Sequence, residues 1–202
     1  MEDAGQKDLV AELSNRSPDD PLVKWDAILK GTKPLLDECQ YERAIKLLGN
    51  ALIDNRKLVG PGVHHYNALT HGTLGHCYFG SGNMDVAKGH YEQAMRHCQD
   101  VDDKEGILVY VQRLYEAYRY LGERSLGADY ALRWADIDED AGRGQHARYM
   151  RNQANLVRQG EPLLRMVMWL DGEPYEIDDA PRIPGTPAVH EAGGNRSSAC
   201  SG

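Results

Sequence analysis

Small and large apolar residues recur along this chain at the spacing of one helix face, and the same arrangement appears three times. Each copy has a small residue, a large residue four positions later and a second small residue three positions after that. The copies are Ala44, Leu48 and Ala51, then Ala87, Tyr91 and Ala94, then Ala128, Leu132 and Ala135. Successive copies lie 43 and 41 residues apart. Self-similarity at a fixed period is typical of stacked helical repeats, so we expect one two-helix unit to recur.

Turn-forming residues divide the helical part of the chain into hairpins. The helical period begins at Pro21, and Pro34 is expected to kink or split the first helix. Glycine and proline at 60–62 end the first hairpin. The second hairpin is expected from about 63 to 101, with its turn at the sequence GSGN, residues 80–83.

A third hairpin and a final helix follow. The third hairpin is expected to begin at Asp102, because acidic residues suit a helix N-terminus, and to turn at Gly122. The final helix, over 144–160, has one apolar side of the kind that a terminal capping helix needs. That side consists of Ala147, Met150, Ala154 and Val157.

The middle copy indicates the kind of repeat. From Asn67 it reads NALTHGTLGHCYFGSGNMDVAKGHYEQAMRHC, and its diagnostic residues are Leu74, Gly75, Tyr78, Gly82, Ala87, Tyr91 and Ala94. In these residues the segment closely resembles a tetratricopeptide repeat (TPR), and the resemblance extends over roughly residues 21–158. Small residues let facing helices approach, while Tyr78 and Tyr91 fill the space above and below them. The period exceeds the family's usual length of about 34 residues, so the chain resembles the lengthened repeats of kinesin light chain.

The resemblance implies an all-α, TPR-like α-solenoid of three helical hairpins plus a capping helix. In TPR stacks the first helix of each hairpin lines a concave groove, so we expect a non-enzymatic adaptor that binds a protein or peptide partner there. The groove residues that the resemblance implies are Lys30, Lys33, Asp37, His65, Thr73, His76, Gln112, Arg113, Glu116 and Tyr120. Lys30, Lys33 and Arg113 can pair with carboxylates of an extended peptide, and Tyr120 can stack on an apolar side chain.

The two ends of the chain have other patterns. Residues 1–20 are polar and acidic and are expected to form a mobile tail before the helical domain at 21–160. Over 161–178 the period becomes alternating around an Asp-Gly pair, which predicts a β-hairpin with a two-residue turn. An isolated hairpin is marginally stable, so it is expected to cap the helices, to pack on its copy in another subunit as a homodimer, or to pack on a partner. Residues 179–202 are rich in Pro, Gly, Ser and Ala and are expected to be disordered.

Composition and charge narrow the classes of function. A net charge of -8 disfavours binding of nucleic acid through a basic face. The sequence has neither an apolar run long enough to span a bilayer nor a basic and then apolar leader, so a cytoplasmic location is expected. It also lacks glycine-rich phosphate cradles, nucleophile elbows and paired catalytic motifs, so neither enzymatic activity nor a cofactor is expected.

Histidines concentrate in the middle repeat, which suggests an alternative function. On antiparallel helices that turn near Gly82, His76 is expected level with His90, where two imidazoles can bind a metal. Within either helix, however, the histidines are never three or four residues apart, so we assign no metal site. The alternatives to a peptide adaptor are therefore a regulatory module that senses a small ligand or metal through this repeat, and a self-associating assembly factor.

Three acidic residues near the end of the third hairpin resemble a second metal motif. Asp136, Asp138 and Asp140 imitate the opening of a calcium loop. Ala141 stands where such a loop needs glycine, and Ala147 stands where it needs glutamate. We therefore expect a solvated acidic helix end instead.

Overall fold

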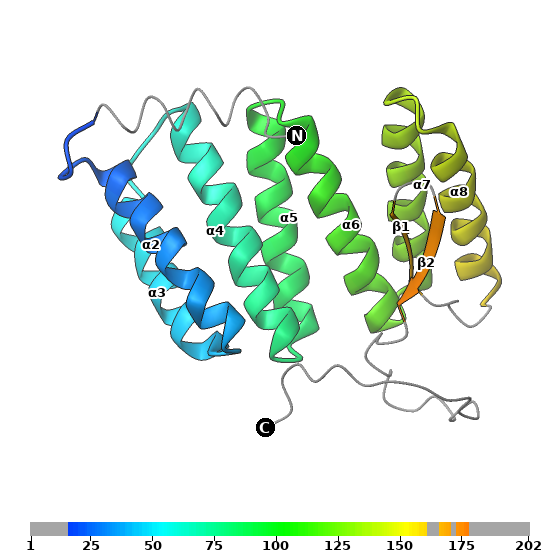
Figure 1. The fold of residues 1–202 in the computed structure, drawn as a ribbon, viewed down its shortest axis with the longest axis horizontal. Helices are drawn as coiled ribbons and strands as arrows, with labels where there is room; N and C mark the ends of the chain where they lie inside the picture. Colours follow the sequence, from blue (N-terminus) through cyan, green and yellow to red (C-terminus); the bar gives the residue numbers. More distant parts are fainter. Residues whose placement is uncertain (1–15, 161–165, 171–172, 178–202) are drawn as a thin grey trace.

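The computed structural model describes residues 16–160, apart from the side chain of residue 61, and it gives the backbone pairing of two short strands further on. The described residues up to 160 form an all-helical fold, as the sequence predicts. Its helices are α2 (Pro21–Asp37), α3 (Tyr41–Asn55), α4 (Pro61–Gly80), α5 (Met84–Asp100), α6 (Lys104–Leu121), α7 (Arg124–Asp140) and α8 (Gly144–Gln159). Figure 1 shows them standing in a row in chain order.

Each helix packs against the next one along the chain. In addition, α2 contacts α4 and α4 contacts α6, so the first helices of successive hairpins form a continuous layer. Contact between neighbours is what a helical repeat requires, because each unit buries its apolar side against the following unit. The buried residues accordingly form a series of clusters, from Trp25 and Tyr66 in the first to Met150 and Val157 in the last.

The connections between helices repeat as closely as the helices do. Five of the six connections between the described helices contain a residue with a left-handed backbone, at φ between 53° and 80°; the exception is the connection from α3 to α4. These residues are Cys39, Gly82, Asp102, Gly122 and Gly142. At the second of them the Gly82 amide donates to the carbonyl of Phe79 (3.0 Å), and the Asn83 amide donates to the carbonyl of Tyr78 (2.8 Å). The other four repeat this pair of hydrogen bonds, which defines the Schellman end of a helix. One local motif therefore reverses the chain at each of these points.

In the third copy, Ala128 and Ala135 are fully buried as predicted, but the large core residue expected between them is not buried. Helices α5 and α7 each have 17 residues and begin at the same distance from the preceding turn glycine. Counted from that glycine, Ala131 takes the place of Tyr91. Leu132, the predicted large core residue, is only half-buried. It follows the buried Ala131 by one residue, and one residue along a helix turns the side chain by about 100° away from the buried side. A large side chain of α6, Tyr115, shares the buried cluster with Ala131 instead.

The close approach of α4 and α5 depends on one glycine. Gly75 faces Tyr91, and a Cβ placed on Gly75 would lie 2.5 Å from a carbon of the tyrosine ring. Tyr91 is buried, so its ring has no room to withdraw. The small residue and the large residue of the middle repeat thus meet across the two helices, as the sequence predicts.

Two predicted helix boundaries differ from the structure. Helix α2 runs without interruption through Pro34, which contradicts the expected split. Pro34 lies near the helix end, and the carbonyl that loses its partner, four residues earlier, belongs to an exposed residue that water can reach. The cap of α6 is Asp103, whose carboxylate accepts from the Gly106 amide (2.9 Å), because Asp102 is used by the left-handed turn.

Beyond the helices the structure gives two strands, β1 (Met166–Leu170) and β2 (Glu173–Ile177). They pair antiparallel, with Met168 opposite Tyr175. The residues outside the described part are 1–15, 161–165, 171–172 and 178–202. The strand side chains are not described either, so the packing of the predicted β-hairpin and the character of both tails stay predictions.

Candidate functional site

Residues of the predicted groove meet at one place, between α4 and α6. The Arg113 guanidinium and the Glu116 carboxylate form an ion pair on α6, with Nη1 and Oε2 3.0 Å apart. His76 of α4 lies close enough to both for their charges to act on its imidazole. Loss of hydration lowers the pKa of His76, the Arg113 charge lowers it further, and the Glu116 charge opposes the change. We call these three residues, from two first helices, the α4/α6 patch.

Other predicted groove residues on the first helices are held by local contacts. Tyr120 of α6 lies against Phe79 of α4, with ring centroids 6.4 Å apart. The Thr73 hydroxyl donates to the carbonyl four residues earlier (2.8 Å), and the His65 ring meets Tyr66 edge-on at 5.7 Å. Tyr120 therefore adds aromatic surface contributed by the same two helices as the patch, while Thr73 and His65 are engaged within α4.

The remaining predicted groove residues lie apart from the patch. Lys30 forms an ion pair with Asp26, one turn earlier on α2, at 2.7 Å. Lys33 and Asp37 are exposed in the second half of the same helix, and Gln112 is half-buried on α6. The structure thus brings His76, Arg113 and Glu116 together, and it connects the α2 residues to them only through the contact between α2 and α4.

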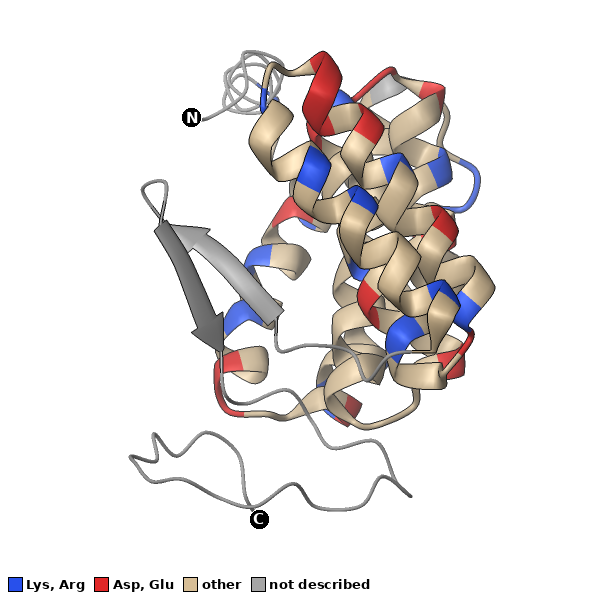
Figure 2. Cartoon of the chain, turned by 90° about the vertical axis from the view of Figure 1, so that its right-hand side faces the viewer, with Lys and Arg blue, Asp and Glu red and all other residues tan. Residues whose placement is uncertain are grey.

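Charged residues of both signs alternate over the outside of the helices in Figure 2. Several of them pair between helices, as Lys88 does with Glu123 at 2.8 Å and Arg158 with Asp129 at 2.9 Å. The Arg158–Asp129 pair is exposed, and exposed pairs contribute little to stability, whereas the Lys88–Glu123 pair is partly buried. Their effect here is to balance the two signs locally.

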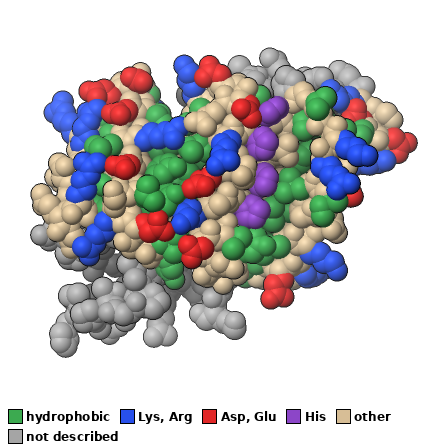
Figure 3. Space-filling view, turned by 180° about the vertical axis from the view of Figure 1, so that it is seen from behind, with side chains coloured by type: hydrophobic (Ala, Val, Ile, Leu, Met, Phe, Trp, Pro, Cys, Tyr) green, Lys and Arg blue, Asp and Glu red, His purple; other side chains and the backbone are tan. Residues whose placement is uncertain are grey.

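A row of histidines that the sequence pattern did not predict runs along α4 and α5 and is visible at the surface in Figure 3. Nδ1 of His71 lies 3.0 Å from Nδ1 of His90, and Nδ1 of His97 lies 3.3 Å from Nδ1 of His64. The rings of His71 and His97 stack with their centroids 5.9 Å apart. We call these four residues the histidine row.

The predicted pairing of His76 with His90 is wrong, because His71 takes that place. Counting residues from the turn shows which residues of the two helices lie at the same height in a hairpin. It does not show the direction in which their side chains point. His76 follows His71 by five residues, which turns it by about 140° around α4. The charge that acts on His76 is instead that of Arg113 on α6, which lowers its pKa.

A sequence signal for the histidine row does exist, at a longer spacing than the one considered. His64 and His71 are seven residues apart, and so are His90 and His97. Seven residues make about two helical turns, so each pair lies on one face of its helix. The pairing across the two helices depends on the rotation of each helix, which the spacing does not give.

Burial lowers the pKa of three members of the histidine row, His71, His90 and His97. Burial lowers the pKa of His71 to about 4, and the neighbouring His90 and His97 act in the same direction. Burial also lowers the pKa of His90 and is the first cause of the lowered pKa of His97. These three imidazoles therefore favour the neutral form, in which one ring nitrogen carries a free lone pair.

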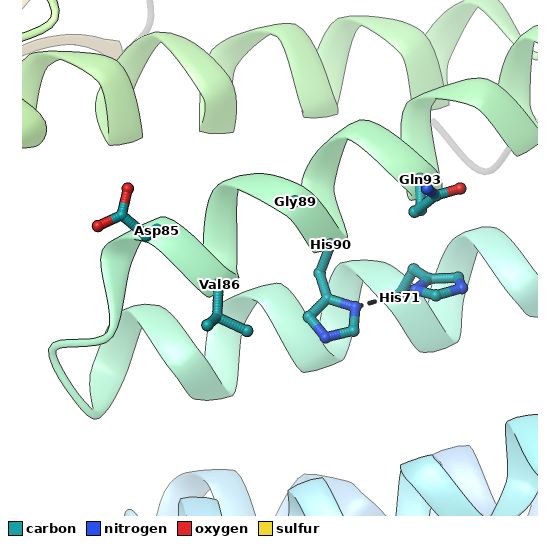
Figure 4. Close-up of a pocket in the computed structure, with 6 residues that line it drawn as sticks. All are labelled: His71, Asp85, Val86, Gly89, His90 and Gln93. Carbon is teal, nitrogen blue, oxygen red and sulfur yellow. Dashed lines mark hydrogen bonds between the residues drawn. The ribbon is translucent and has the colours of Figure 1, made fainter.

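A shallow hollow of about 310 Å³ opens beside His71 and His90. Figure 4 shows the side chains around it and the contact between the two imidazoles. It is lined by His71, Asp85, Val86, Gly89, His90 and Gln93. Sites that bury a small molecule have volumes of roughly 300 to 1,000 Å³ and are enclosed, so this open hollow is a weak candidate for one. Tyr78 stacks on the His90 ring at 5.3 Å and holds it at the edge of the hollow.

Comparison with known proteins does not assign this chain to a family. No protein-family model, no curated protein and no solved structure matches the chain. Among the described helices, none combines the length and the apolar character needed to cross a membrane. The structure defines a helical, repeat-like fold, and the function has to be argued from its sites.

Proposed function

We propose that this protein is a non-enzymatic interaction module of the TPR type, a solenoid of three helical hairpins and a capping helix that binds a peptide segment of a partner protein. The recurring helix ends, the packing of each helix on the next and the continuous layer of α2, α4 and α6 support this architecture. The observation that carries the binding site is the α4/α6 patch. In the patch, exposed His76 and Arg113 come from the first helices of adjacent hairpins.

The chemistry of the patch indicates the kind of peptide. The ion pair with Glu116 engages Nη1 of Arg113, and a guanidinium carries further N–H donors on its other nitrogens. Those donors suit the carboxylate of an acidic side chain, which Arg binds in a bidentate manner. Tyr120 and Phe79 offer aromatic surface to an apolar residue of the same peptide. An extended segment that carries both acidic and apolar residues fits this combination.

The order of the first helices α2, α4 and α6 indicates how the peptide lies on the protein, with its length running across the three helices. Exposed Lys33 lies on α2, which contacts α4, which in turn contacts α6 with Arg113. A segment lying across these helices would place a second acidic residue near α2. Glu116 in the patch would repel a carboxylate in any register that moved it away from Arg113, so the patch also provides selectivity.

A double charge reversal tests the proposal. Lys33→Glu combined with Arg113→Glu should reduce the amount of partner captured from the source cell at least about tenfold, measured by quantitative mass spectrometry. The far-ultraviolet circular dichroism should stay unchanged, because exposed charge changes rarely unfold a domain. The matched control is Lys46→Glu combined with Arg96→Glu, two exposed residues on the second helices α3 and α5. If the Lys33→Glu, Arg113→Glu variant captured as much partner as the control variant does, the interface would lie elsewhere on the protein.

Two further expectations belong to the same proposal. Self-association through residues 161–178 and a cytoplasmic location are both proposed from sequence alone. The mass of the full chain in solution, measured by sedimentation over a range of concentrations, tests the first of them. A mass equal to one chain at every concentration would remove the homodimer from the proposal.

A further inference from the structure

Three potential ligand atoms converge where α4 begins and α5 ends. Nδ1 of His64 lies 3.3 Å from Nδ1 of His97 and 3.1 Å from Oδ2 of Asp100. Nδ1 of His97 lies 3.9 Å from the same carboxylate oxygen. His64 belongs to the first turn of α4, and the other two residues belong to the last turn of α5. The helix pairing, and not a local sequence motif, brings them together.

These separations resemble the edges of a tetrahedral metal site. With metal–ligand bonds of about 2.0 to 2.1 Å, two ligand atoms on a tetrahedral Zn²⁺ lie about 3.3 Å apart. The observed edges are 3.1, 3.3 and 3.9 Å. The longest edge involves the Asp100 carboxylate, which is 54% exposed and has room to rotate. Two imidazoles and a carboxylate are a donor set that zinc and its neighbours in the first transition row bind.

Hydrogen bonding alone does not satisfy this cluster. The Nδ1 atom of a neutral imidazole carries either one hydrogen or one lone pair. If Nδ1 of His64 carries a hydrogen and donates it to Asp100, the same atom has no lone pair to accept a hydrogen bond from His97. If Nδ1 of His64 carries a lone pair and accepts from His97, that lone pair also faces the negatively charged carboxylate. Every neutral tautomer therefore leaves one close contact without a hydrogen bond of its own. A cation between the three atoms uses a lone pair of each at once.

We propose that His64, His97 and Asp100 bind one Zn²⁺ ion through two Nδ1 atoms and one carboxylate oxygen, with water in the fourth position. Asp100 and the 37%-exposed His64 leave the position accessible to an ion from solvent. The ion would link the first turn of α4 to the last turn of α5. It would therefore stabilise the folded middle hairpin by mass action.

The rest of the histidine row holds the ring of His97 in place. His71 stacks on His97 with an interplanar angle of 17°, and its own Nδ1 lies 3.0 Å from Nδ1 of His90. His90 is stacked in turn on Tyr78 at an interplanar angle of 6°. Neighbours that fix the orientation of a ligand ring are a regular part of metal sites. The zinc site shares no residue with the α4/α6 patch and is independent of the proposed peptide binding.

Calorimetric titration tests the proposal on the full chain after treatment with a chelator. ZnCl₂ should bind with a stoichiometry of one, and His97→Ala should weaken binding at least about tenfold, since loss of a supporting residue alone costs about 10- to 100-fold. Asp100→Asn, which keeps the shape of the side chain, should weaken binding in the same direction. The matched control is His76→Ala, which removes an imidazole from the same repeat on another side of α4 and should leave zinc affinity unchanged.

Nitrogen-15 spectra of the histidine rings identify the ligand atoms. Addition of one equivalent of ZnCl₂ should move the Nδ1 resonances of His64 and His97 and should leave those of His76 in place. If His97→Ala does not fold, as judged by circular dichroism, the half-exposed His64→Ala gives the same test. The proposed site would be wrong if no zinc bound below millimolar ZnCl₂. It would also be wrong if one equivalent of zinc still bound with unchanged affinity in both His97→Ala and His64→Ala. Shifts confined to Nε2 atoms would overturn the proposed ligand set.

Discussion

Asp138 occupies in α7 the position that Cys98 occupies in α5, and both side chains are buried, at 1% and 2% exposure. Both residues follow the preceding turn glycine at the same distance. The buried carboxylate is paired with Arg143, at 2.7 Å, and with Nδ1 of His146. The expectation of a solvated acidic helix end is therefore wrong for Asp138. Its partners come from the following turn and from α8, so Asp138 ties the last two helices together.

Removing the Asp138 carboxylate should destabilise the fold. In Asp138→Ala, the hydrogen bonds that the buried carboxylate accepts are lost, and a hydrogen bond to a charged group contributes about 1.5 to 3 kcal/mol. Because the carboxylate has two partners, we expect the free energy of unfolding to fall by at least about 1.5 to 3 kcal/mol, measured by urea denaturation. Asp136→Ala is the matched control, because Asp136 is exposed and its ion pair with Arg151 is on the surface. Equal urea midpoints for the two variants would contradict the role of Asp138.

Enlarging Ala87 should overpack the contact within the middle hairpin. Ala87 is fully buried in the largest of the core clusters, so Ala87→Leu has no space for the added carbons. We expect a loss of about 1 to 3 kcal/mol in the free energy of unfolding. The neighbouring Val86 is 38% exposed, and Val86→Leu should change the thermal melt very little. An unchanged melt for Ala87→Leu would remove the repeat alignment of the middle hairpin.

Two glycine substitutions should change stability in opposite directions. Gly75→Ala pushes a methyl group against the Tyr91 ring and should cost about 1 to 3 kcal/mol. Gly49→Ala, inside α3, meets nothing within 4 Å and should stabilise the protein by about 0.5 to 1 kcal/mol through helix propensity. Chemical denaturation of both variants checks the pair. A gain in stability for Gly75→Ala would show that α4 and α5 do not approach as described.

Alkaline pH should destabilise the fold through its buried thiols. Burial raises the pKa of Cys77 to about 11 and that of Cys98 to about 12, whereas the ordinary value is 9.0. Between the ordinary and the raised pKa the unfolded chain loses protons that the folded chain keeps. The contribution of the protonated buried thiols to the free energy of unfolding is therefore complete below about pH 9. It decreases as the pH rises above that value. Burial also raises the pKa of Tyr91 and Tyr110, which extends the effect to higher pH.

The measurement for this prediction is the urea midpoint at pH 8 and at pH 10.5. The midpoint should be lower at pH 10.5, and the difference should shrink in Cys77→Ala, which has one buried thiol fewer. The variant will be less stable at both pH values, so the comparison uses only the change between them. An equal change in the variant and the parent chain would assign the alkaline effect to other groups.

Much of the helical architecture was predictable because its signals are local. Gly82 and Gly122 mark helix ends through backbone angles that favour glycine, and the apolar side of α8 follows from helical spacing alone. Gly75 and Tyr91 are two of the seven residues that carry the resemblance of the middle repeat to a TPR, and they meet in the structure. The one-residue error at Leu132 arose where a large apolar residue stood beside the buried position, so pattern matching had two choices.

The candidate sites depended on contacts between helices. The sequence by itself determined that six histidines lie in one repeat and that two pairs of them are seven residues apart. Only the tertiary structure decided that His71 meets His90, that His64 and His97 meet Asp100, and that His76 lies within range of the Arg113 charge. Hydrogen bonds and glycine turns act over a few residues and leave a trace in the sequence. The relative rotation of two packed helices is set by all the side chains between them, so it decides which residues form a site.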